Sequence, residues 1–496
     1  MRRHSLLRGT LLLTAASLGL RGSSMCFQVF LSGRIGAAGV GLLQLIASVS
    51  FLAATIGSAG VRVAAMYLTA EEYGARRPGG MRKALLCCLL YGLLASSLGG
   101  LVLHRASDWI AVTWIGDGRA ASSLRVIAWS LPLTCLWSVM AGYFTACSRL
   151  RQLVWVEFVD QGISIAVTVA LLLRWAGNDT ERACLSIHLG NAAATAVTLV
   201  LLLVQALAGR RAPIPQGLGM WRRLGKLCLP LAANDTLRSG LSTTEQMLIP
   251  RGLARAGGSS RAAMADYGTI HGMVFPVMMF PAVLLQSLSD LLVPELARCR
   301  AARDVRRIRS LTERCLRAGL LFGASVAGLC WALAAPLGQL LFGSAAASRY
   351  LRLFAPLAVV LYLDALVDGM HKGLGEQVYC VRVNTLTNLM DVVLLWLLLP
   401  RWGIGGYFCT FTVTHFLNFY LSLSRLLTVT GAAPPLGYVV WVLACTAAAA
   451  WAASRLASLW AAPLAACLGG LLGYAALLGA GLLAAGAGQR AAKEAD

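Results

Sequence analysis

The chain has 496 residues, of which 58% are hydrophobic and only 13% are charged. Soluble domains carry about 25% charged residues, so the composition excludes a soluble protein of this size, a disordered chain and a small disulfide scaffold. The formal charge of +22 does not indicate nucleic-acid binding, because membrane proteins concentrate Lys and Arg in their cytoplasmic loops. We therefore expect an all-α polytopic membrane protein.

Fourteen apolar segments, separated by charged or Gly- and Pro-rich breaks, predict transmembrane helices of about 20 residues or more. In chain order they cover 6–31, 39–66, 84–104, 124–147, 153–174, 184–208, 227–250, 266–294, 315–335, 350–371, 377–400, 404–427, 436–456 and 459–486. No cleavage site follows the first segment, so we interpret it as a retained helix rather than a signal peptide. Basic residues are roughly twice as frequent in the N-terminus and the loops on its side, which predicts that both termini are cytoplasmic.

The densest basic segment is 298–317, RCRAARDVRRIRSLTERCLR. Val305, Ile308, Leu311 and Cys315 recur in it at helical spacing between the arginines. This pattern predicts an amphipathic helix that lies on the inner leaflet and binds anionic lipids.

The two halves of the chain repeat each other weakly. The segments 171–175, LLLRW, and 398–402, LLPRW, align without a gap. With a slightly shorter offset, Arg21 aligns with Arg238. Six helices per repeat give two parallel repeats, which is typical of transporters with a central site. We therefore predict an N-lobe over 1–210, a cytoplasmic linker over 211–226, a C-lobe over 227–430, and two additional helices with a cytoplasmic tail over 431–496.

Charged residues inside the predicted helices are the candidate site residues, because a charge in the membrane normally faces a cavity or a partner. Arg21, Arg62 and Arg238 predict a pyrophosphate site, since guanidinium stays charged and binds phosphate oxygens bidentately. The alternative interpretation is structural, with these arginines either paired to nearby carboxylates or extended to the membrane interface.

Acidic and amide residues predict a second, cation-binding site. The candidates are Asp235, Glu245, Asp364, Asp368, Asn388 and Asp391. Their oxygens suit Na⁺ or a proton relay, and either could serve as the coupling ion; hydrogen bonding between helices is the alternative. We expect no cofactor and no resident metal, because the cysteines and histidines show no ligand spacing. No ATP-binding or hydrolase motif is present, so we do not expect an enzyme.

Several segments resemble the stage V sporulation protein B family. They are 29–45 (VFLSGRIGAAGVGLLQL), 69–74 (TAEEYG), 361–384 (LYLDALVDGMHKGLGEQVYCVRVN), 399–407 (LPRWGIGGY) and 417–427 (LNFYLSLSRLL). That family belongs to the multidrug/oligosaccharidyl-lipid/polysaccharide exporter superfamily. Arg21 matches a basic residue of the family's first helix. Gln28 stands where a second basic residue is usual, and Arg62 stands where relatives have Pro or another neutral residue.

The resemblance implies fourteen helices in two lobes around a cavity that works by alternating access. It implies a flippase of the bacterial cytoplasmic membrane that moves an undecaprenyl-pyrophosphate-linked sugar outward, for the cell wall or spore cortex. Two rivals remain open: a cation-coupled antiporter for drugs or organic cations with the same fold, and a non-transporting scaffold that binds cell-wall synthesis enzymes. The sign of the charge in the cavity distinguishes the flippase from the antiporter.

Overall fold

The structure is a computed structural model that describes residues 2–58, 60–177, 179–207, 219–433 and 436–495, with side chains between residues 16 and 480 of these ranges. Every regular element in these ranges is a helix, which confirms the all-α prediction. The chain folds into two compact units. The central unit is Arg34–Pro250, and the terminal unit combines Met1–Gly33 with Arg251–Asp496.

The units do not divide where the lobes were predicted to divide, at 210 and 227. The start of the chain packs with the later half, where the Gln28 side-chain amide donates to the Gly272 carbonyl oxygen at 2.9 Å. The segment before Pro250 packs with the earlier half, where Cys228 and Leu231 lie against Gly60. The predicted linker 211–226 lies partly outside the described residues, and helix has already begun at Gly219.

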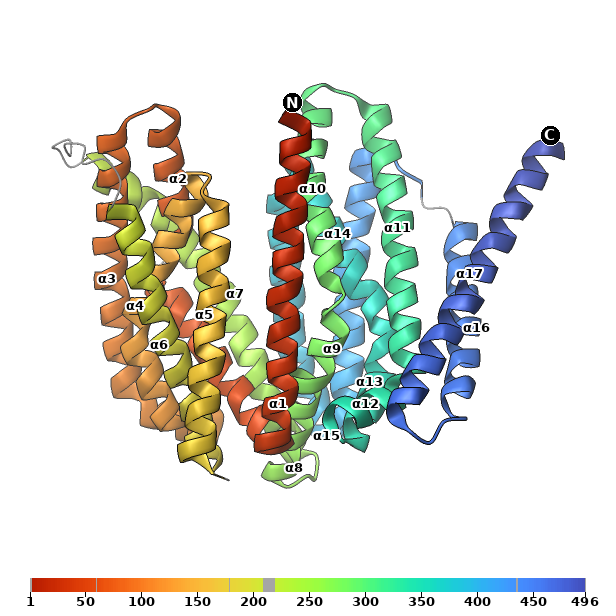
Figure 1. Ribbon diagram of the computed structural model, residues 1–496, viewed down its shortest axis with the longest axis horizontal. Coiled ribbons are helices and arrows are strands. Elements are labelled where there is room, and N and C mark those ends of the chain that lie inside the picture. The colour runs from red at the N-terminus through yellow and green to blue at the C-terminus, as the bar shows by residue number, and fades with distance from the viewer. Residues whose placement is uncertain (1, 59, 178, 208–218, 434–435, 496) are drawn as a thin grey trace. The chain divides into compact units, whose positions relative to one another are not determined.

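The central unit is a bundle of long helices (Figure 1). Its elements are the second part of α1 (Arg2–Ser58), α2 (Val61–Gly74), α3 (Pro78–Trp109), η1 (Ile110–Ile115), α4 (Ala120–Ala146), α5 (Leu150–Leu171), η2 (Leu172–Ala176), α6 (Thr180–Leu207) and the first part of α7 (Gly219–Arg255). Gly36 breaks α1 (φ 68°, ψ 174°). Small residues bring these helices close together, and a Cβ at Gly142 of α4 would lie 2.7 Å from the Arg62 carbonyl oxygen of α2.

The terminal unit holds the remaining elements. They are α8 (Ser260–Thr269), η3 (Ile270–Val274), α9 (Phe275–Met279), α10 (Ala282–Ala301), α11 (Val305–Ala332), α12 (Ala334–Phe342), α13 (Ala345–Phe354), η4 (Ala355–Leu357), α14 (Ala358–Leu374), α15 (Gln377–Thr430), α16 (Leu436–Ala457) and α17 (Pro463–Ala495). Gly403 breaks α15, at the gap between two predicted helices. The core around Leu296, Leu366 and Leu426 joins α10, α14 and α15.

The predicted repeat has a counterpart in the backbone. Gly177 (φ 53°, ψ −124°) and Gly403 (φ 54°, ψ −131°) adopt nearly the same left-handed conformation, which glycine reaches without steric cost. Each glycine follows an Arg-Trp pair, but Ala176 is one extra residue in the first repeat. That residue lies in η2, a π-helix. Because a π-helix is a one-residue insertion in an α-helix, the two glycines are equivalent positions.

Ten of the described helices are long and apolar enough to span a membrane, or eleven if the bent pair Ser260–Met279 and Ala282–Ala301 forms one span. The multi-pass prediction is confirmed, while the count of fourteen stays a prediction. α15 covers two predicted helices on either side of a glycine break. α1 covers the predicted helix 6–31 and the first part of 39–66, whose end belongs to α2 because the chain breaks before Val61. α7 covers the predicted helix 227–250 but is not among the spanning helices, because it is rich in charged and polar residues.

The basic segment 298–317 does not form the separate amphipathic helix that we predicted. Arg298–Ala301 is the last turn of α10, and a turn with a positive φ at Arg303 follows. Asp304 then caps α11, its side chain accepting from the Arg307 backbone N–H at 3.0 Å. No Gly or Pro interrupts the sequence immediately after this cap, so one helix runs from the basic segment into the apolar one. Binding of anionic lipids by this segment stays a prediction.

Candidate functional site

The central unit contains a cavity of about 700 Å³ between α1, α2, α4 and α7. Its charged lining residues are Arg62, Asp235 and Arg238. The hydroxyl groups that line it come from Thr55, Ser58, Thr134, Ser138, Ser239 and Ser242, and the apolar residues include Phe51, Val63 and Leu131. The cavity therefore combines two guanidinium groups, one carboxylate and a hydroxyl-rich wall.

Helical spacing and one glycine place these side chains together. Asp235, Arg238, Ser239 and Ser242 recur at intervals of three and four residues, so they share one face of α7. The break between α1 and α2 ends at Gly60 (φ 73°), a conformation that favours glycine. A Cβ there would lie 2.9 Å from the Leu231 Cβ. Gly60 thus lets the break approach α7 and places Arg62 at the same cavity as Arg238.

The two arginines of the cavity are available to a ligand. Both side chains are exposed, and neither forms an ion pair with any carboxylate in the part of the chain that is described. The Glu157 carboxyl on α5 is close enough to feel the charge of Arg62, although Glu157 does not line the cavity. Ser239 is 3% exposed, and its hydroxyl has no hydrogen-bond partner among the residues that the structure describes, which leaves an unused polar group at the cavity wall.

The structure groups the predicted site residues differently from the sequence. Arg62 and Arg238 come together in the central unit, whereas Arg21 is an exposed residue of the terminal unit. Asp235 was grouped with the cation-binding acids but lines the cavity of the two arginines. Glu245 lies further along α7, partly buried and outside the lining residues.

The other acids form a buried polar network in the terminal unit. The Asn418 amide donates to both Asp364 carboxylate oxygens, at 3.0 and 3.1 Å. The Thr387 hydroxyl donates to the Asn418 side-chain oxygen at 3.2 Å. Thr414 donates to Asp391, which is 5% exposed, at 2.6 Å. The network joins α14 to both parts of α15.

Asp368 lies one turn along α14 from Asp364. One of its carboxylate oxygens is buried and has no hydrogen-bond partner in the described part of the chain. Asn388 is half-buried on α15. Carboxylate, amide and hydroxyl oxygens are ligands that suit Na⁺, and the unpartnered oxygen fits a bound cation or proton. Sequence reasoning missed Thr387, Thr414 and Asn418, although the spacing of Thr414 and Asn418 in an apolar helix was a usable signal.

Known proteins with sequence similarity point to one group. A model of the MatE family matches residues 14–171. Stage V sporulation protein B of Bacillus subtilis (strain 168) is 26% identical over 333 residues, which are 65% of this chain and 64% of that protein, just under two thirds of its length. Sporulation protein YkvU of the same organism is 21% identical over 339 residues, which are 67% of this chain and 74% of that protein.

Solved structures with the same fold are transporters and a flippase. The lipid II flippase MurJ in an inward closed conformation superposes with a TM-score of 0.72 at 12% identity, covering 94% of this chain and 98% of that chain. An inward-facing multidrug resistance MATE family transporter of the MOP superfamily superposes with a TM-score of 0.63 at 15% identity, covering 83% and 95%. At these identities the likeness shows the fold.

Proposed function

We propose that this chain, a member of the multidrug/oligosaccharidyl-lipid/polysaccharide exporter superfamily related to stage V sporulation protein B, is a lipid flippase. Its substrate is an undecaprenyl-pyrophosphate-linked oligosaccharide or peptidoglycan precursor, carried across the cytoplasmic membrane. The observation that supports this proposal most is the two arginines, Arg62 and Arg238, which line a hydroxyl-rich cavity and form no ion pair within the described residues. The group to which the chain belongs consists of transporters and flippases rather than enzymes.

The chemistry of the cavity suits such a headgroup. Two guanidinium groups match the two negative phosphates of a pyrophosphate, and each can bind phosphate oxygens bidentately. The six Ser and Thr hydroxyls are hydrogen-bond partners for sugar hydroxyls. Arg21, which aligns with Arg238 in the repeat, is an exposed cation of the terminal unit and does not line this cavity. The prenyl tail stays in the lipid while the headgroup occupies the cavity, and alternating access releases it outward.

The acid network of the terminal unit is our candidate for energy coupling. Na⁺ or H⁺ binds at Asp364, Asp368 and Asp391, where buried oxygens are held by Asn418 and Thr414. The membrane potential is a second source of energy, worth about 2.3 kcal/mol per charge at 100 mV. Either the bound ion or the membrane potential can favour outward over inward movement, if the carrier moves one net charge per cycle.

A binding measurement tests the proposal. Purified wild-type protein is mixed with lipid II and with undecaprenyl pyrophosphate, and complexes are quantified by native mass spectrometry. Arg62→Ala and Arg238→Ala should each weaken binding at least tenfold, because each removes a charge-assisted pair worth about 1.5–3 kcal/mol. The matched control is Arg125→Ala, since Arg125 pairs with Asp108 at 2.7 Å and does not line the cavity. Equal binding by all four proteins contradicts the proposal.

One observation favours a second candidate, a cation-coupled antiporter for drugs or organic cations. Asp235 places a carboxylate in the same cavity as the arginines, and a carboxylate attracts an organic cation. Binding of organic cations by the wild type, lost in Asp235→Asn, together with no binding of any pyrophosphate lipid, would support the antiporter instead.

A further inference from the structure

The segment 69–74, TAEEYG, lies at the end of α2, away from the cavity lining. Its two acids meet one arginine of α7. Arg223 forms an ion pair with Glu71, and its other terminal nitrogen lies 3.5 Å from a Glu72 carboxylate oxygen. One guanidinium therefore engages two consecutive carboxylates, and the contact joins two elements that are far apart in the sequence.

Glu72 is fixed more firmly than a surface acid. Its side chain is 11% exposed, compared with 50% for Glu71 and 41% for Arg223. A Cβ at Gly80 would lie 2.1 Å from a Glu72 carboxylate oxygen, so a larger residue at position 80 would displace this carboxylate. Because α3 begins at Pro78, the carboxylate lies at the N-terminal end of α3, where the helix dipole favours a negative charge. Glu72 is thus held by both α3 and α7.

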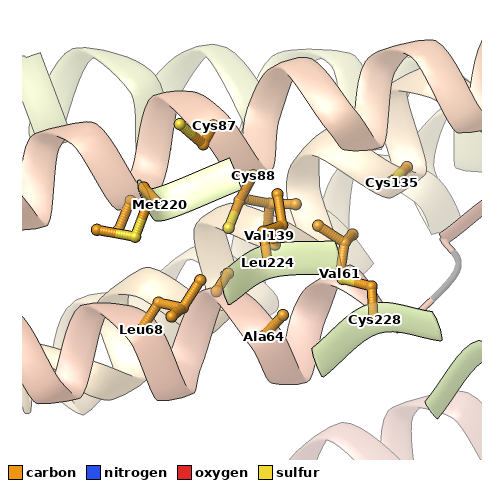
Figure 2. Close-up of a cluster of buried hydrophobic side chains, with 12 residues drawn as sticks. Val61, Ala64, Leu68, Cys87, Cys88, Cys135, Val139, Met220, Leu224 and Cys228 are labelled. Atoms are coloured by element: carbon orange, nitrogen blue, oxygen red, sulfur yellow. The ribbon is translucent and has the colours of Figure 1, made fainter. Parts of the chain in front are cut away.

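Beyond the ion pair, an apolar seam continues along α2 and α7. Met220, Leu224 and Cys228 of α7 are buried against residues of α2, α3 and α4. Figure 2 shows Leu224 and Cys228 on α7, with Leu68, Ala64 and Val61 of α2 below and beside them. The two helices run antiparallel, since Glu72 lies by Arg223 while Gly60 lies by Cys228 and Leu231.

The seam ends where the cavity begins. Gly60 marks one end of α2, and Arg62 follows two residues later. On α7, Asp235 and Arg238 come within two turns after Leu231. Pro230 lies between them and the ion pair, and proline removes a backbone hydrogen bond from the helix interior. Cys228 and Leu231, on either side of Pro230, both lie against Gly60, so the contact between α7 and α2 continues past the proline. The position of Arg238 relative to Arg62 therefore depends on how firmly α7 is seated on α2.

We propose that Glu71, Glu72 and Arg223 are positioning residues that fix α7 on α2 and so set the spacing of Arg62 and Arg238. Two guanidinium groups in one cavity can bind the two phosphates of a diphosphate headgroup together, and in that respect the inference rests on the proposed function. An exposed ion pair without this role would contribute little to stability and nothing to ligand choice. Loss of the ion pair should weaken binding of a diphosphate lipid more than binding of a monophosphate lipid.

The test compares Arg223→Gln, Arg223→Lys and the control Arg222→Gln. Arg222 is the neighbouring exposed residue of α7, and it has no ion pair in the described ranges. Affinities for undecaprenyl pyrophosphate and undecaprenyl phosphate are measured by native mass spectrometry. A second readout needs no substrate: alkylation by N-ethylmaleimide is quantified at Cys228, which is 1% exposed in the seam, and at Cys184, which is 0% exposed in α6.

We expect Arg223→Gln to weaken diphosphate binding about fivefold, which corresponds to about 1 kcal/mol, with a smaller change for the monophosphate. It should raise alkylation of Cys228 several-fold and leave Cys184 protected, which excludes general unfolding. Arg223→Lys should retain both properties, and Arg222→Gln should resemble the wild type. Unchanged alkylation of Cys228 in Arg223→Gln overturns the inference. If the wild type binds neither lipid, the proposed function fails, while the alkylation result still decides whether Arg223 seats α7.

Discussion

Asp235 should limit the affinity of the cavity for its anionic substrate. It lies three residues before Arg238 on the same face of α7, so the two Cβ atoms are about 5–6 Å apart. A phosphate held by Arg238 would then lie on the order of 7 Å from the carboxylate. With an effective dielectric constant of about 40 for a water-lined cavity, each unit of phosphate charge is repelled by about 1 kcal/mol. Asp235→Asn removes this repulsion and leaves the volume of the side chain nearly unchanged.

Because the phosphate nearest to Asp235 carries at least one unit of charge, we expect Asp235→Asn to bind undecaprenyl pyrophosphate at least about fivefold more tightly than the wild type. Transport should become slower, because a product that binds more tightly dissociates more slowly. Affinity is measured by titration in native mass spectrometry, and transport by the movement of a fluorescent pyrophosphate lipid in proteoliposomes. The expected result is a lower KM together with a lower kcat.

The matched control is Asp160→Asn. Asp160 is an acid of the same unit, but it accepts a hydrogen bond from Thr198 at 2.8 Å and does not line the cavity. Its substitution should leave affinity for the lipid unchanged. Weaker lipid binding in Asp235→Asn would refute the electrostatic reasoning, because the carboxylate would then be making an attractive contact with the substrate.

Three further changes test the packing, the turn and the second site. Gly100→Ala should destabilise the protein by about 1–3 kcal/mol, because its Cβ would lie 2.5 Å from a backbone oxygen of α4. At Gly162, a Cβ would meet nothing within 4 Å beyond its own helix backbone and chain neighbours among the described residues, so Gly162→Ala should leave the melting temperature unchanged or raise it. In the turn before α4, a hydrogen bond from Arg119 lowers the pKa of the Asp117 carboxyl. The charged carboxylate therefore stabilises the folded protein fully at pH values above the usual pKa of Asp. This contribution is lost as the pH falls through the lowered pKa of the folded state. Asp117→Asn should therefore flatten the acid side of a melting-temperature profile. Asp391→Asn should abolish the dependence of transport on Na⁺ or pH and leave lipid affinity unchanged.

The helices were predictable because each apolar run is long and ends at a strong break. The break at Gly403 is an example, because Pro400 and Arg401 directly before it indicate the end of the apolar segment. The separate interface helix over 298–317 was predicted wrongly. Arginines between apolar residues indicate a helix on the membrane surface only if that helix ends where the arginines end. In the structure, the helix that begins at Val305 continues to Ala332. Amphipathic periodicity alone does not show where a helix ends.

The partners of the candidate site residues were less accessible to prediction. A Thr or Asn in an apolar helix is a weak signal by itself, and pairs such as Asn418 with Asp364 depend on which helices become neighbours. The same limitation applies to Asp235. Its residue type suggested a cation site, but its position on α7 places it with Arg62 and Arg238. Charge type was readable from the sequence, whereas the grouping of charges required tertiary structure.

The repeat explains why the units and the predicted lobes differ. The spacing from Gly33 to Pro250, where the units divide, equals the spacing from Arg21 to Arg238 in the repeat alignment. Each repeat therefore contributes its first helix to the unit that the other repeat builds. Because each of these helices carries one of the aligned arginines, the exchange gives each unit one cation from the other half of the chain. The buried acids on α14 and α15 lie in later helices of the second repeat and are not exchanged, so the acid network stays within one unit while the aligned arginines are divided between the two units.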